Sequence, residues 1–114
     1  MILELIALLE TYGYPVRRQG SFSPTEQYPA AFFTWWNPDT ESVSHYDNKP
    51  DATVWDVDVN FYAESPALVY STIESVIAKL RENGWIVDGK GYDAASDEPT
   101  HFGRGVQAVF RENN

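Results

Sequence analysis

Two aspartates, Asp56 and Asp58, stand two residues apart in the segment TVWDVDVNFY (53–62). In an extended strand they point to the same face, with carboxyl groups about 6–7 Å apart. Some glycosidases use carboxylate pairs at similar separations for acid–base chemistry. That chemistry also needs a cleft lined by further polar groups, for which a chain of 114 residues with long hairpins has little room. We therefore interpret the pair as part of a solvated or interfacial sheet face.

The other reactive side chains form no recognisable site. His45 and His101 are the only histidines and occur in no HxxxH or HxH spacing, whereas a metal needs three or four convergent ligands. A small hydrolase or metal-dependent enzyme using His45, Asp56 and Asp58 is therefore the least supported hypothesis. No serine lies in a Gly-x-Ser-x-Gly elbow, and the absence of cysteine excludes thiolate chemistry. We expect no catalytic residue, metal or cofactor.

The charge of the chain argues against nucleic-acid recognition. The formal net charge is −9, and Arg17-Arg18 is the only adjacent basic pair, whereas binding to phosphates depends on clustered Lys and Arg. From Asp39 to Glu64 there are seven acidic residues and one basic residue. The apolar N-terminus is interrupted by Glu4 and is too short to span a bilayer. We expect neither specific nucleic-acid binding nor membrane association.

Hydrophobic periodicity predicts two helices that could position these residues. Apolar residues recur at helical spacing from Ile2 to about Tyr12, and Gly13 follows. The second helix should begin at Ser65-Pro66, which supplies an N-cap and a proline at the first helical position. It should end at Gly84, a residue typical of a helix C-terminus.

The remaining segments alternate between strand and turn patterns. Strands are expected at Val16–Gly20, Ala30–Trp36, Ser42–Tyr46, Thr53–Tyr62, Trp85–Val87 and Gly105–Arg111. Turns or loops are expected at Ser21–Tyr28, Asn37–Thr40, Asp47–Asp51 and Asp88–Thr100.

These elements predict a single α+β domain over residues 1–114, a two-layer sandwich in α-β-β-β-α-β order. The sheet should be mainly antiparallel, with both helices packed on one face. Trp55, Val57, Val59 and Phe61 should lie beneath the helices, and replacing Trp55 by alanine should cost about 3–5 kcal/mol if its ring is in the core. The aromatic run at 30–36 has rings on both faces. The outer rings are either covered or form a partner surface.

The order of elements resembles that of the small tail-terminator or tail-completion proteins of long-tailed phages and prophages. The segment VWDVDVNFYAESPALVYSTIESVIAKLRENGW (54–85) and the strand GRGVQAVF (103–110) carry the resemblance. It covers nearly the whole chain, and the acidic segment 37–51 departs from it. It implies a structural protein that forms a ring, typically a hexamer, at the head-proximal end of the tail tube. Tail-tube and head-connector proteins would be its partners.

The resemblance also implies a location in the bacterial cytoplasm during assembly and in the virion tail afterwards, with DNA only as passing cargo. An acidic lumen would repel DNA and let it pass without binding. The alternative is a small-molecule-binding or regulatory module in which exposed aromatics of the 30–36 strand line a pocket. Under the first hypothesis we expect assembly contacts at Trp36, Tyr46, Asp56, Asp58, Asn60 and Tyr62.

Overall fold

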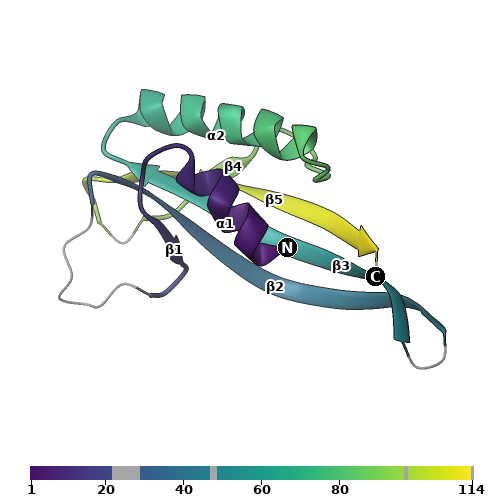
Figure 1. Ribbon diagram of the computed structural model, residues 1–114. Helices are drawn as coiled ribbons and strands as arrows, with labels where there is room; N and C mark the ends of the chain where they lie inside the picture. Colours follow the sequence, from purple (N-terminus) through teal and green to yellow (C-terminus); the bar gives the residue numbers. More distant parts are fainter. Residues whose placement is uncertain (22–28, 47–48, 97, 114) are drawn as a thin grey trace.

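Two helices cover one face of a five-stranded sheet (Figure 1). The computed structural model describes residues 1–21, 29–46, 49–96 and 98–113, with side chains described except at 39 and 41–51. The strand order is β1-β2-β3-β5-β4; β1 is parallel to β2, and all other pairs are antiparallel. This confirms the expected α+β class. The elements are α1 (Ile2–Glu10), β1 (Val16–Arg18), β2 (Ala31–Tyr46), β3 (Lys49–Ala63), α2 (Pro66–Glu82), β4 (Tyr92–Ala94) and β5 (Phe102–Asn113).

The second helix begins and ends where its sequence signals predict. The Ser65 hydroxyl accepts a hydrogen bond from the backbone N–H of Leu68 at 3.3 Å, and Pro66 occupies the first turn. At the other end Gly84 has φ +88, and the N–H of Trp85 donates to the Leu80 carbonyl at 3.0 Å. A side chain at position 84 would make this left-handed backbone costly, so glycine ends the helix.

The core lies between the helices and the inner face of the sheet. Phe33 and Phe61 meet there with ring centroids 4.6 Å apart, and Val57 and Val59 are fully buried. Trp55 belongs to the same strand face but is only partly buried and lies outside the core cluster. Its indole N–H donates to a carboxylate oxygen of Glu112 at 3.3 Å. The prediction that Trp55 is a core residue was therefore wrong.

The helical layer ends near this position, which explains the exposure of Trp55. The N-terminal amine at the start of α1 lies 4.0 Å from the Glu112 carboxylate, the same side chain that bonds the indole. Beyond this point β2 and β3 continue as a hairpin that extends past the helices (Figure 1). We call its outer part, residues 39–46 and 49–56, the arm. It contributes to the elongated dimensions of the molecule, 52 × 30 × 22 Å.

The arm exists because β2 does not turn where the sequence suggests. Asn37 and Pro38 stand opposite the single residue Val57, so the strand absorbs them as a bulge and continues to Tyr46. The predicted turn at Asn37–Thr40 was therefore wrong. Residues Ser42–Tyr46 are not a separate strand but the end of β2. The bulge leaves Pro38 outside the ladder, where its missing N–H removes no strand pairing. Asp47 and Asn48 of the expected turn lie outside the described residues, and β3 already begins at Lys49.

The segment after α2 also differs from expectation. The predicted strand Trp85–Val87 is a single bridge, in which Ile86 and Val109 exchange backbone hydrogen bonds of 2.8 and 3.0 Å. The predicted loop Asp88–Thr100 contains the short strand β4, paired with the beginning of β5. Glycines around this strand obscured it, because turn residues dominate the local pattern. The expected loop over Ser21–Tyr28 falls largely on 22–28, outside the described residues.

Candidate assembly surface

The sheet face opposite the helices, here called the outer face, holds the side chains expected to mediate assembly. The register places Trp36 of β2 opposite Asp58 of β3, with Thr34 opposite Asn60 and Phe32 opposite Tyr62. Asp56 follows on the same face of β3, two residues from Asp58. The structure therefore brings five of the six expected residues onto one face. The sixth, Tyr46, lies at the end of β2 in the arm, and its side chain is outside the described part.

The aromatic residues of this face divide into a covered end and an open end. Phe32 is only 2% exposed, because its ring stacks on Tyr62 at 5.2 Å and approaches the His101 ring at 6.0 Å. Trp36, four residues along the strand, is 37% exposed, with the Arg18 guanidinium 4.6 Å above its ring. Both alternatives for the rings of the 30–36 strand thus occur, since Phe32 is covered and Trp36 is exposed.

Two glycines of β5 leave room for tyrosine rings on the outer face. A Cβ atom at Gly103 would lie 2.6 Å from the Tyr62 ring, and one at Gly105 would lie 3.1 Å from the Tyr92 ring. Tyr92 comes from β4 and is 46% exposed. Sequence reasoning missed this residue because it lay in a predicted loop. The signal available was the alternation of Gly103 and Gly105 on one strand face, which is typical of close approach by a neighbouring group.

The two aspartates are held by hydrogen bonds within this face. Asp56 accepts two bonds from the Gln107 amide, at 2.9 and 3.1 Å. Partial burial, followed by repulsion from Asp56, raises the pKa of Asp58, and a hydrogen bond with Tyr92 offsets part of that rise. Burial and the Asp58 charge likewise raise the pKa of Tyr92. The surface is therefore acidic, and its carboxylates are held by hydrogen bonds within the chain.

The histidines do not join these aspartates. His101 is buried, with one ring nitrogen 2.8 Å from the Pro29 carbonyl and the other 3.0 Å from the Thr100 hydroxyl. The side chain of His45 is outside the described part of the chain. Among the described residues no three His, Asp or Glu side chains converge as metal ligands. His101 is thus bonded to other groups and does not lie with Asp56 and Asp58.

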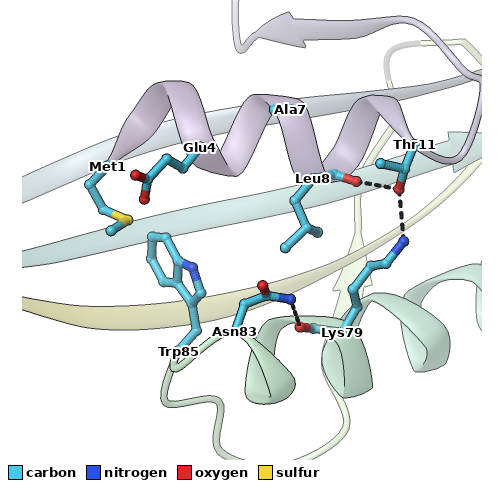
Figure 2. A pocket seen from close by; sticks show the side chains of 8 residues that line it. All are labelled: Met1, Glu4, Ala7, Leu8, Thr11, Lys79, Asn83 and Trp85. Atoms are coloured by element: carbon cyan, nitrogen blue, oxygen red, sulfur yellow. Dashed lines mark hydrogen bonds between the residues drawn. The ribbon is translucent and has the colours of Figure 1, made fainter.

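A groove of about 380 Å³ lies on the other side of the molecule, between the two helices (Figure 2). Lys79 of α2 crosses one end and donates to the Thr11 hydroxyl at 2.8 Å. The Trp85 ring lies at the other end, beside Met1 (Figure 2). This groove is lined by the helices and Trp85, not by residues 31–36. It therefore gives no support to the alternative of a pocket formed by the aromatic strand.

No model of a known protein family matches the chain, and no curated protein is significantly similar to it in sequence. Neither of the two described helices combines the length and apolar character that crossing a membrane requires. The fold and the outer face define the chain as an α+β protein that carries a long arm and an acidic, partly aromatic surface.

Proposed function

We propose that the chain is a structural subunit of a phage or prophage tail, a tail terminator whose copies form a ring at the head-proximal end of the tail tube. The observation that carries the proposal is the outer face, on which five of the six expected contact residues lie together. The arm extends the sheet beyond the helical layer (Figure 1), and within the described residues β5 pairs with it only over Ala52–Asp56. The rest of the arm offers strand backbone to a neighbour.

The edges of the sheet suit repeated association. Within the described residues the pairing of β1 with β2 covers only Phe33–Trp35. Unpaired strand edges and exposed rings such as Trp36 supply backbone and side-chain contacts to neighbouring chains. When two different patches of identical chains meet under a rotation that closes, a ring results. A ring is the form that a terminator requires.

The acidic part of the outer face suits a channel through which DNA passes. Asp56 and Asp58 lie side by side on this face beside the exposed Trp36. Carboxylates that face a lumen repel phosphate groups and prevent DNA from adhering. The proposal therefore places this face toward the lumen, or toward the tube on which the ring sits.

Reconstitution with the tail-tube protein encoded nearest to this gene tests the proposal. Light scattering behind size exclusion should detect a ring-sized species, either alone or with tube protein. Electron micrographs should show that adding the chain limits tube length. Tubes that grow to the same length with and without the chain would contradict the proposal. So would a gene neighbourhood that lacks tail-tube and head-connector genes.

A matched pair of variants tests the assigned surface. Trp36→Ala removes an exposed ring from the outer face, whereas Leu3→Ala removes an 81% exposed side chain from the helical face. Both should melt near the wild-type temperature. Only Trp36→Ala should weaken ring formation and tube termination. If the two substitutions affected ring formation and tube termination equally, the outer face could not be assigned as the contact surface.

A further inference from the structure

A hollow of about 410 Å³, lined by α2, residues 89–90 and Arg104, is basic although the chain as a whole is acidic. Its lining contains three of the eight basic residues of a chain whose net charge is −9, and only one acidic residue. Ile77 and Ala78 of α2 provide an apolar wall. We call it the basic hollow, and its lining residues are Tyr70, Glu74, Ile77, Ala78, Arg81, Gly89, Lys90 and Arg104.

Two arginines hold the loop that forms the rim of the basic hollow. Arg81 donates to the Val87 carbonyl at 2.7 and 3.2 Å and to the Gly89 carbonyl at 3.2 Å. Arg104 donates to the carbonyls of Lys90 and Gly91, at 3.0 and 3.3 Å. Both guanidinium groups are therefore fixed in position before binding. Such preorganisation lowers the entropic cost of a contact.

The positive charge of the hollow is only partly neutralised within the described chain. Arg104 forms an ion pair with Asp93 at 2.9 Å, and its guanidinium lies over the Tyr70 ring at 4.6 Å. The Arg81 bonds end on uncharged carbonyl groups. Neither Arg81 nor Lys90 forms an ion pair with any acidic residue that the structure describes. The hollow is thus suited to a carboxylate-bearing partner.

We propose that the basic hollow receives the acidic arm of a second copy of this chain. Apart from Asp56, which accepts bonds from Gln107 on the outer face, the sequence from 39 to 55 carries four acidic residues and one lysine, the opposite sign to the hollow. The hollow is lined by residues of α2, by Gly89 and Lys90, and by Arg104 of β5. The arm is formed by β2 and β3 and extends beyond the helices (Figure 1). One chain therefore presents its arm and its hollow to different neighbours.

A contact between two different surfaces is head-to-tail, the type that closes a ring. The inference rests on the proposed function for its biological setting. The contact between the arm of one copy and the basic hollow of another can be tested with the purified protein, without a phage tail. Charge complementarity predicts that the contact weakens with salt, since a Debye length falls from about 10 Å at 0.1 M to 3 Å at 1 M.

The absence of native cysteine allows a direct cross-linking test with full-length protein. Ser44→Cys places a thiol on the arm, and Ala78→Cys places one in the basic hollow without altering its charges. The two variants, carrying tags of different size, are mixed and oxidised mildly. Mixed disulfide is measured on a non-reducing gel. Ala7→Cys, an exposed alanine that lines the groove between the helices, is the matched control for Ala78→Cys.

The Ser44→Cys and Ala78→Cys pair should cross-link several-fold faster than the Ser44→Cys and Ala7→Cys pair. This difference in cross-linking rate should disappear in 1 M salt. It should also disappear when Lys90→Glu is added to the Ala78→Cys chain. When Lys90→Glu is present, adding Asp47→Lys and Asp51→Lys to the Ser44→Cys chain should restore the faster cross-linking. Equal rates for the two pairs, or no mixed disulfide at all, would overturn the inference.

The outcomes separate this inference from the proposed function. Termination of tail tubes together with control-level cross-linking would overturn the arm–hollow contact and leave the terminator function standing. Salt-sensitive cross-linking without any effect on tube length would support the contact and contradict the terminator function.

Discussion

The side-chain oxygen of Asn60 occupies the place where any residue other than glycine at position 105 would put its Cβ atom. Asn60 and Gly105 are directly opposed in the β3–β5 ladder, and Asn60 is only 7% exposed. The Tyr92 ring closes over the same point from β4. One missing side chain therefore allows three strands to meet on the outer face.

Gly105→Ala is expected to destabilise the protein by about 1–3 kcal/mol, because Asn60 is buried and must shift to admit a methyl group. Urea unfolding measures the loss. Asn60→Ala removes the obstacle, so the double variant should lose less stability than the sum of the two single variants. Additive losses would mean that the two residues do not compete for space.

Asp58 is expected to make the protein less stable as pH rises. Its folded-state pKa is raised above 3.8, mainly by burial, so the folded state binds the proton more tightly than the unfolded state. Stability should therefore fall as pH rises from about 3.8 through the raised value. Asp58→Asn should remove this fall and melt higher than wild type at neutral pH.

Melting curves between pH 3 and pH 8 check this sign. Asp88→Asn, at an exposed position after α2, serves as the control for removal of one negative charge. A pH dependence that is unchanged in Asp58→Asn would show that its carboxyl group is not penalised in the folded state.

Trp55→Ala should cost about 1–3 kcal/mol, because the ring is only partly buried and its indole bonds Glu112. Phe61→Ala, on the same strand face, should cost about 3–5 kcal/mol because that ring is fully buried beneath the helices. Chemical denaturation of both variants gives the comparison. A larger loss at Trp55 would place the edge of the core further along the arm.

Ser65→Ala should lower stability by about 1 kcal/mol, since the backbone N–H of Leu68 loses the hydroxyl that accepts its hydrogen bond. Ser71→Ala is the matched control, because that hydroxyl bonds a carbonyl inside α2 and caps no helix end. Thermal unfolding compares the two. Equal losses would deny Ser65 a role as N-cap.

Asp56→Lys combined with Asp58→Lys should leave rings intact and slow the passage of DNA, because lysines facing the lumen would attract phosphates. Glu10→Lys with Glu82→Lys makes the same charge change on exposed helical positions and is the control. DNA release from phage that carry each pair measures the effect. Unchanged infectivity in the first pair would remove the acidic lumen from the proposal.

Local signals in the sequence were enough to predict both helices and the two faces of β3. Ser65, Pro66 and Gly84 act through bonds within a few residues, so their roles do not depend on distant contacts. The alternation from Val57 to Phe61 likewise predicted which side chains meet the helices. For this reason most of the expected contact residues were found together on the outer face.

The continuation of β2 through Pro38, the strand at Tyr92 and the exposure of Trp55 could be decided only by the tertiary structure. Pro38 and the glycines near β4 carry turn signals, yet pairing with β3 and β5 offers backbone hydrogen bonds that outweigh them. Trp55 belongs to an apolar strand face, but its burial depends on how far the helices reach along the sheet. Local patterns encode which elements form, and long-range packing decides how far each one extends.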